Sequence, residues 1–432
     1  MQSITLNEGQ EKAAKQIFKF LMSDDLEFSI SGPAGTGKTT LMKYVSDVLL
    51  PDYKNAQRLM GERYVDYDVA YTATTNKAAE VLTRATGEDT QTIHSFLSLR
   101  VYDDYKTGKS VIKPTGAFKV FSNTLIFIDE ASMIDRALYD YLMKATDPTC
   151  KIIYLGDHCQ MAPVFEDISP VYRNPVHTAL LTEPMRNAGQ PALVALCEAL
   201  RHTVETKQFF HIDSVPGVID YLEPNDAQQF IDDQFKVENE DIRILAYTNR
   251  RVKSYLSHIR ALRGYPDTYT KGEHLISNSA MMFGNKPGLR VEERLLVDEV
   301  LSGIYPFEVS SGVLLDVYEL QIQRQNKATI HLKIPADPAH FNELMRYFSR
   351  QKNWERFYFL KNNFPDLRPR DACTVYKSQG STYESVFMDL SNIGSCTNAD
   401  QLARMLYVGA SRARSNLYLF GQLPERLMNQ ST

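Results

Sequence analysis

The sequence predicts an α/β fold with two parallel sheets flanked by helices, and three patterns support this prediction. Apolar runs of strand length lead into polar residues: residues 124–128 precede Asp129, and residues 151–155 precede Gly156 and Asp157. Helix-like stretches separate these runs, and a second series of such strands begins at residue 242. Continuous apolar runs are typical of parallel strands covered on both faces, whose carboxyl ends meet at one ligand-binding edge.

Length and composition limit the class of protein. With 432 residues, 43% of them hydrophobic, the chain exceeds one compact unit, so we expect several domains. The net charge of −5 and the pI near 6.0 require any nucleic-acid site to be a local basic groove. The five scattered cysteines lack C-x2-C spacing, which argues against a zinc site or a disulfide framework.

A glycine-rich motif lies between a strand-like stretch at residues 27–30 and a helix-like stretch at residues 40–45. Its residues are Gly32, Pro33, Ala34, Gly35, Thr36, Gly37, Lys38 and Thr39, followed by Thr40. Glycines let backbone N–H groups surround phosphate oxygens, and the helix N-terminus adds favourable charge. In such a loop Lys38 reaches the β and γ phosphates and Thr39 binds Mg2+. The motif predicts a nucleoside triphosphatase; a glycine-rich turn without a ligand is the alternative.

Two adjacent carboxylates, Asp129 and Glu130, follow the apolar run at residues 124–128. Charges at the mouth of a buried strand are costly unless a ligand needs them. With Lys38 in the same sheet, Asp129 is predicted to bind Mg2+ and Glu130 to orient the attacking water. Gln160, which follows the next strand, is predicted to contact the γ phosphate. The alternative for Asp129 and Glu130 is a solvated acidic turn without a ligand.

Further polar residues lie near predicted helix starts. Gln10 precedes the apolar helix face at residues 13–21 and is either a surface amide or an adenine contact. Thr75 and Asn76 open a helix after a strand-like run, where a threonine either binds backbone phosphate or caps the helix. A single histidine such as His94, without other polar residues that form a site with it, is interpreted as having a structural role.

The α/β pattern restarts after residue 242 without a second phosphate loop, and its later strands are predicted near residues 372–376, 384–388 and 416–420. Between them, residues 313–318 and 329–334 predict strands of a small β insert, which a helix follows. Aromatic residues after that helix either pack in the core of the insert or stack on bases; they are Trp354, Phe357 and Tyr358.

The order of these motifs resembles that of superfamily 1 helicases of the RecD/Dda type, the group called superfamily 1B. The matching stretches are residues 32–40 (motif I), 73–79 (Ia), 92–96 (Ib), 128–133 (II), 155–164 (III, with 182–186 beside it), 245–252 (IV), 374–380 (V) and 406–414 (VI). The resemblance covers roughly residues 6–190, 242–253 and 371–420. Most of these motifs are modest individually, whereas their order and spacing are highly specific.

The resemblance implies two RecA-like domains with a nucleotide between them. Their expected bounds are residues 1–187 for the first, residues 188–270 with 371–432 for the second, and residues 271–370 for an inserted domain that is β-rich, SH3-like and partly helical. Arg186 and Arg412 match arginines that reach the nucleotide, and Gly380 and Glu384 are assigned to it on the same basis. Single-stranded DNA crosses both domains in this family, which implies DNA contacts at Thr75, Asn76, His94, Lys377 and Ser378.

Three positions depart from the family pattern. Thr74 stands where proline is usual, and Asn76 and Tyr376 stand where relatives often carry histidine. These differences leave the expected ATPase site intact and affect the DNA contacts.

The function implied is an ATP-dependent DNA helicase that requires Mg2+ and moves 5′ to 3′ on single strands. Its expected partners are single-stranded DNA, junctions with duplex, and replication or recombination proteins. We expect a cytoplasmic monomer without membrane attachment, in the host cytoplasm if a phage encodes it. The alternatives are a nucleic-acid-stimulated ATPase that does not unwind and a P-loop kinase or metabolic triphosphatase.

A strand-separating element is expected within about residues 97–119. Residues 99–102 and 110–113 are short alternating runs, and Gly108 lies in the turn-like stretch between them. We predict a protruding β-hairpin; a plain surface loop is the alternative. Related helicases carry a separation pin in this interval.

Overall fold

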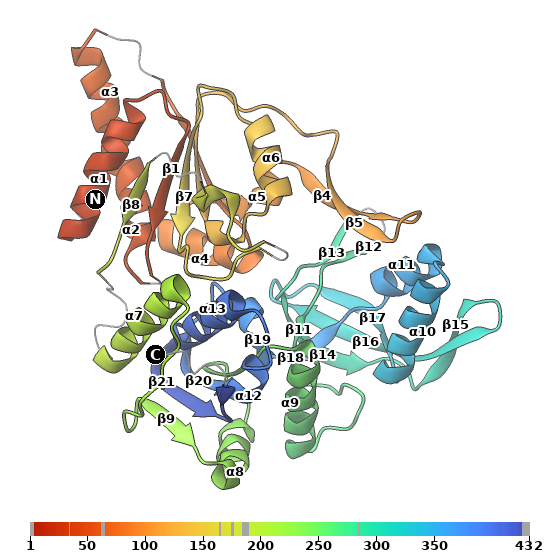
Figure 1. Ribbon diagram of the computed structural model, residues 1–432. Coiled ribbons are helices and arrows are strands. Elements are labelled where there is room, and N and C mark those ends of the chain that lie inside the picture. The colour runs from red at the N-terminus through yellow and green to blue at the C-terminus, as the bar shows by residue number, and fades with distance from the viewer. Residues whose placement is uncertain are drawn as a thin grey trace.

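The computed structural model describes residues 4–33, 35–61, 65–163, 166–173, 177–183, 190–283 and 286–425. Figure 1 shows two parallel sheets with their helices, and an antiparallel insert beside the second sheet. This arrangement confirms the predicted α/β fold with two parallel sheets flanked by helices.

The first sheet has six parallel strands in the order β3-β2-β6-β7-β1-β8. Their bounds are β1 (Glu27–Ser31), β2 (Asp68–Ala73), β3 (Thr90–Thr92), β6 (Thr124–Asp129), β7 (Lys151–Gly156) and β8 (Thr178–Leu180). β6 and β7 are buried almost throughout, as their apolar runs predict. Because Ala73 pairs with Asp129 and Ser31 with Gly156, the ends of four strands meet at one edge.

Helices cover both faces of this sheet (Figure 1). They are α1 (Glu8–Leu21), α2 (Lys38–Tyr44), α3 (Leu50–Leu59), α4 (Asn76–Thr86), α5 (Ile93–Phe96) and α6 (Arg136–Lys144), with a π-helical turn at Val45–Leu49 between α2 and α3. α1 buries the apolar face predicted for it, and its N-cap Asn7 forms a capping box with Gln10. Across the described ranges, no helix is long and apolar enough to span a membrane.

The second sheet has five parallel strands in the order β19-β10-β20-β21-β9. They are β9 (Ile219–Leu222), β10 (Ile242–Ala246), β19 (Ala372–Thr374), β20 (Tyr383–Asp389) and β21 (Ala413–Phe420). The surrounding helices are α7 (Pro191–Thr206), α8 (Pro224–Phe235), α9 (Asn249–Leu262), α12 (Leu390–Ile393) and α13 (Ala399–Ala410). α13 is buried almost along its whole length, because it packs against α7 and lies between the two parallel sheets.

The insert between β10 and β19 is built on an antiparallel sheet. Its strands are β11 (His274–Ser277), β14 (Arg294–Val300), β15 (Tyr305–Ser310), β16 (Val313–Arg324), β17 (Thr329–Pro335) and β18 (Leu367–Pro369), beside the two-stranded pair β12 (Met281–Phe283) and β13 (Lys286–Leu289). β16 and β17 contain the two predicted strands. α10 (Pro338–Arg350) and α11 (Trp354–Asn363) follow, and Tyr358 is buried, as its core-packing interpretation predicts.

The expected hairpin is present, formed by β4 (Leu99–Asp104) and β5 (Lys109–Pro114). The strands pair antiparallel from Leu99 with Pro114 to Asp104 with Lys109. In Figure 1 the hairpin extends from the first sheet toward α11 of the insert. The structure therefore excludes the plain surface loop.

Candidate active site

The glycine-rich loop lies at the end of β1 and leads into α2. Gly35 and Gly37 have φ values of 85° and 77°, a left-handed conformation that favours glycine. A Cβ at Gly32 would lie 2.4 Å from the Leu181 carbonyl oxygen, so no side chain fits there. The Lys38 ammonium donates to the carbonyls of Gly32 and Pro33, each at 2.8 Å, and so lies over the loop.

The remaining loop residues support this conformation. The Thr36 hydroxyl donates to the Pro33 carbonyl at 3.0 Å. Thr39 is half-buried and Thr40 is exposed, both in the first turn of α2. Ala34 lies outside the described residues.

Gln10 contacts the loop from α1. The residue is buried, which excludes the surface-amide interpretation. Its Oε1 accepts from the Asn7 N–H at 3.0 Å, and its Nε2 donates to the Gly37 carbonyl at 3.2 Å. Gln10 is thus held beside the loop, and its contact with adenine stays a prediction.

The predicted acidic pair lies where β6 ends. Asp129 Oδ1 accepts from the Glu130 N–H at 2.9 Å, and Glu130 has a left-handed backbone with φ of 53°. Burial and the neighbouring Asp129 carboxylate raise the pKa of Glu130 to about 7, whereas Arg412 and Lys38 oppose this shift. Burial lowers the pKa of Lys38, and nearby carboxylates oppose that change. The loop lysine and the acidic pair therefore act on each other electrostatically.

Two residues that precede strands of the second sheet, Gly380 and Arg412, act on or lie near Glu130. Glu130 Oε1 lies 3.9 Å from the position that a Cβ would take at Gly380. The buried Arg412 guanidinium donates to the carbonyls of Ser381 and Val408, each at 3.1 Å. These bonds fix the Arg412 side chain beside the second sheet, and its charge acts on Glu130 at the edge of the first.

Gln160 forms part of the contact between the two parallel sheets. The residue is buried, its Oε1 lies 3.5 Å from the donor Nε2 of Gln379, and its carbonyl accepts from Arg404 at 2.6 Å. Glu384 is exposed on β20 and accepts from the Ser415 hydroxyl, so its carboxylate bonds within the second sheet. Arg186 lies outside the described residues.

Sequence reasoning passed over Asp157, a fully buried carboxylate directly after β7. It accepts hydrogen bonds from the Arg201 guanidinium and the Tyr407 hydroxyl, which lie on helices α7 and α13 beside the second sheet. It also accepts from the Cys159 N–H. Although burial alone would raise it, the charges of Arg201 and Lys38 hold the pKa of Asp157 below its usual range. The sequence signals were its place directly after a buried strand and within the stretch 155–164, and neither names its partners, which lie far away in the chain.

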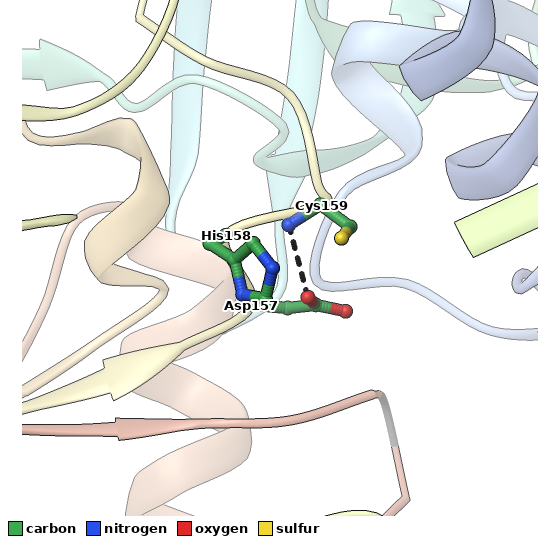
Figure 2. A group of neighbouring side chains, drawn as sticks. All are labelled: Asp157, His158 and Cys159. Atoms are coloured by element: carbon green, nitrogen blue, oxygen red, sulfur yellow. Dashed lines mark hydrogen bonds between the residues drawn. The ribbon is translucent and has the colours of Figure 1, made fainter. Parts of the chain in front are cut away.

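Asp157, His158 and Cys159 have potential metal-ligand atoms within 4.8 Å of one another (Figure 2). The Asp157 oxygens are already bound to Arg201, Tyr407 and a backbone N–H. Burial and Asp157 raise the pKa of the Cys159 thiol to about 12, whereas a metal would need its thiolate. The cluster is therefore an interdomain polar contact and does not fit a metal centre.

Four of the five predicted DNA contacts line one groove of about 950 Å³ between the first sheet, the second sheet and the insert. They are Thr75, Asn76, His94 and Lys377. Ser378 is fully buried, and its hydroxyl donates to the Val375 carbonyl at 2.7 Å, so it faces away from the groove. An adjoining hollow of about 650 Å³ shares Tyr376 and Lys377 and continues over the second sheet.

The groove residues differ in charge and in local role. The Thr75 hydroxyl accepts from the Ala78 N–H at 3.1 Å, so it caps α4 as the alternative interpretation holds. Lys377 donates to the Asn278 carbonyl at 2.6 Å and lies 3.6 Å from Glu292 of the insert. Burial lowers the pKa of His94, which is therefore neutral at pH 7.

The tip of the hairpin contacts α11. A Cβ at Gly108 would lie 2.4 Å from Trp354 Cε2, so glycine permits close contact with the indole. The Asp103 carboxylate accepts from Asn362 at 3.1 Å and from Lys361 at 3.3 Å. The rings of Tyr105 and Tyr358 meet edge to face. The hairpin is thus held at its base, where the buried Leu99 packs in the core beside β6 and β7, and at its tip by the insert.

Comparisons with known proteins agree with this geometry. The model of an AAA domain matches residues 5–214, and the model of the UvrD-like helicase C-terminal domain matches residues 371–420. The ATP-dependent DNA helicase dda of Enterobacteria phage T4 is 24% identical over 456 aligned residues, covering 96% of this chain and 98% of that protein. The RecBCD enzyme subunit RecD of Haemophilus influenzae is 28% identical, and the alignment covers 96% of this chain and 69% of that protein.

Among solved structures, a Pif1 helicase from Bacteroides in complex with ADP-AlF3 and ssDNA has a TM-score of 0.51 and 13% identity, covering 99% of this chain and 95% of that one. It shows the same fold. Two parallel sheets that meet at a phosphate loop, an acidic pair and an arginine define a tandem RecA-like P-loop triphosphatase. Within this class, the two family-model matches and the similarity to dda and RecD along nearly the whole chain support a superfamily 1B helicase of the RecD/Dda type.

Proposed function

We propose that this protein is an ATP-dependent DNA helicase that unwinds duplex while moving along one strand, 5′ to 3′. The observation that carries the proposal is the pairing of two features. The phosphate loop and Glu130 face Gly380 and Arg412 across the two sheets, and a groove that contains Lys377 crosses the same boundary. A change in the nucleotide cleft can thereby change the groove.

In the nucleotide site, Lys38 holds the β and γ phosphates and the loop N–H groups surround them. Thr39 and Asp129 fit a Mg2+ ion, since both offer oxygen ligands beside the loop; the ion would neutralise charge on the phosphates. Glu130 orients the water, Gln160 senses the γ phosphate, and Arg412 with Arg186 stabilises the transferring group. Gln10 contributes to adenine binding, Gly380 to the cleft wall, and Glu384 to the nucleotide site as the family pattern implies.

DNA binding is assigned to the groove. Thr75, Asn76, His94 and Lys377 would contact the strand there, with the bases free to stack against neighbouring side chains. Ser378 would act through its backbone or after a rearrangement, because its hydroxyl is bound to Val375. The local cations of the groove are compatible with the overall charge of −5.

Strand separation is assigned to the hairpin formed by β4 and β5. Its tip is braced by Trp354 and by the Asp103 contacts, so a duplex pressed against it would not simply displace it. A motor that only remodels complexes would not need such an element. This observation favours the helicase over the non-unwinding translocase.

A helicase of this kind needs two RecA-like domains, and we divide the chain accordingly. We assign residues 1–187 to the first RecA-like domain, residues 188–270 and 371–432 to the second, and residues 271–370 to the insert. A monomer is sufficient, since one chain contains both halves of the cleft. Replication or recombination proteins are the proposed partners, and the cytoplasm is the proposed location.

The test is unwinding of duplexes that carry either a 5′ or a 3′ single-stranded tail, with Lys38→Ala as the inactive control. We expect unwinding of the 5′-tailed duplex only, ATP hydrolysis stimulated by single-stranded DNA, and loss of both in Lys38→Ala. DNA-stimulated hydrolysis without unwinding of either duplex would indicate the translocase. Hydrolysis indifferent to DNA would indicate a metabolic triphosphatase.

A further inference from the structure

A second cavity, of about 480 Å³, lies between α4, the second sheet and the insert. We call it the Arg243 pocket and define it by Arg243, Tyr383, Lys77, Arg84, Arg290 and Gly380 of its lining. Neither the phosphate loop nor the Mg2+ residues line it.

Arg243, on β10, is the unusual residue of this pocket. The residue is only 8% exposed, and its Nε finds no hydrogen-bond partner among the described residues. Over the part of the chain that is described, no carboxylate forms an ion pair with this guanidinium. Its planar group instead stacks on the Tyr383 ring, 4.7 Å from the ring centroid. The charges of Asp371 and Glu292 act on Arg243 only from beyond ion-pair distance. A buried guanidinium whose Nε stays without a partner is costly, which favours an anionic ligand that would complete the site.

Carboxylates also line the pocket: they are Glu80, Glu240, Asp241, Glu292 and Glu293. Among the described residues, neither these nor the neighbouring Asp371 forms an ion pair with Arg243, and Glu293 pairs with Arg324 instead. Asp371 pairs with Arg263 at 2.6 Å, and Glu292 lies 3.6 Å from Lys377. At the rim, Glu240 pairs with Arg294 and Arg370.

Other cations face the same space. Lys77 Nζ lies 5.9 Å from the centroid of the same Tyr383 ring, and Lys77 lines the cavity from α4, whereas Arg243 lines it from β10. Burial and the charge of Arg243 lower the pKa of Lys77, as expected for two cations that share a cavity. Arg84 and Arg290 also line the pocket and add positive charge around it.

The pocket connects with both sites described above. Its lining includes Gly380, whose Cβ position lies 3.9 Å from Glu130 Oε1, and Ser381, whose carbonyl accepts from Arg412. The pocket also shares Asn76, Lys77 and Arg290 with the DNA groove. An anion could therefore arrive from the nucleotide cleft or from the strand.

We propose that the Arg243 pocket is a second phosphate-binding site, in which Arg243 and Lys77 hold one phosphate group between α4 and β10. The guanidinium fork matches phosphate oxygens, and Lys77 adds a point charge. Two sources supply this chemistry: the phosphate released by hydrolysis, or a phosphodiester of the bound strand. The choice of source rests on the proposed function, whereas phosphate binding itself does not.

Equilibrium dialysis with radiolabelled inorganic phosphate tests the binding. Saturating ADP is present, so that the phosphate loop is filled. We expect one saturable site in the wild type and an affinity about tenfold or more lower in Arg243→Met, since hydrogen bonds to charged groups contribute at least that factor. Arg136→Met, which removes the same charge from the exposed face of α6, should bind phosphate like the wild type. No saturable site, or equal binding by Arg243→Met, would overturn the proposal.

A second pair of variants keeps the test decisive if Arg243→Met does not fold. Arg243→Lys keeps the charge and should retain part of the affinity, and Lys77→Met should weaken binding from the α4 side of the cavity. Undiminished binding in Lys77→Met would contradict a site formed by both residues. Dialysis requires no hydrolysis, so an inactive helicase would leave this result unchanged.

Two further arms identify the source. Displacement of the labelled phosphate by a short oligothymidylate assigns the pocket to the strand. If DNA does not compete, stopped-flow measurement of phosphate release during ATP hydrolysis should show slower release in Arg243→Met. Absence of both effects would overturn the assignment to either source.

Discussion

The Tyr407 hydroxyl donates a hydrogen bond to the Asp157 carboxylate, and this bond joins the two parallel sheets. Tyr407 lies on α13 beside the second sheet, whereas Asp157 follows β7 of the first. Both are buried, and burial with the nearby carboxylate raises the pKa of Tyr407 well above its usual value. The phenol therefore stays a donor at every physiological pH. Because Asp157 also acts electrostatically on Lys38, the bond links the phosphate loop to α13.

Tyr407→Phe should reduce both stability and coupling between the sheets. The change removes one hydrogen bond to a buried charge, so we expect a loss of about 1–3 kcal/mol in the free energy of unfolding. DNA-stimulated ATP hydrolysis should fall, while ADP binding persists. Denaturant unfolding and hydrolysis assays measure these effects. Tyr139→Phe is the matched control, since it removes a tyrosine–carboxylate bond to Glu27 within the first unit; equal losses of hydrolysis in both variants would contradict the coupling role.

Arg412→Ala should lower turnover far more than ATP binding. An arginine that stabilises the transferring phosphoryl group contributes about 10³ to 10⁵ in rate, and the charge of Arg412 acts on Glu130 from the second unit. Single-turnover hydrolysis and binding of an ATP analogue separate the two quantities. A defect confined to ATP binding would make Arg412 a ground-state ligand. Circular dichroism checks the fold, because Arg412 also bonds to Ser381.

The salt dependence of DNA binding should separate Lys377 from His94. Lys377→Met removes a cation from the groove, so the log–log slope of affinity against salt should become shallower by about 0.7 for the one phosphate that is no longer neutralised. Burial lowers the pKa of His94, so this ring is uncharged at pH 7.5 and His94→Gln should leave the slope unchanged. Fluorescence anisotropy with labelled oligothymidylate measures both slopes. A shallower slope in His94→Gln would show that His94 binds DNA as a cation.

Replacing residues 101–111 with a short Gly-Ser linker should uncouple unwinding from ATP hydrolysis. The hairpin contacts α11 and lies away from the phosphate loop, so DNA-stimulated hydrolysis should stay near wild type. Unwinding should fall severely, and more for G·C-rich duplex, because melting a base-pair step costs about 1.4 kcal/mol on average. Terminal pairs still open spontaneously, so some unwinding should remain.

A finer variant tests the brace of the hairpin. Asp103→Ala removes the acceptor for Asn362 and Lys361 but leaves the hairpin strands intact. Its unwinding should lie between those of the wild type and the linker variant. Parallel losses of hydrolysis and unwinding in the linker variant would assign the segment to the motor, and unchanged unwinding would place strand separation elsewhere.

The sequence alone was sufficient for the features that depend on neighbours along the chain. The apolar runs predicted β6 and β7, the glycine spacing predicted the loop before α2, and the alternating runs around Gly108 predicted the hairpin. Each depends on local backbone preference and on side-chain periodicity, which a linear pattern records directly.

Only the tertiary structure decided which side chains meet. The Asp157 carboxylate finds Tyr407 and Arg201 on other elements, and Ser378 turns inward to the Val375 carbonyl although its motif predicts a DNA contact. Arg243 becomes notable only because the folded sheet buries it without an ion-pair partner among the described residues. Such partnerships depend on burial and on the relative placement of two sheets and an insert, and no spacing in the sequence specifies that placement.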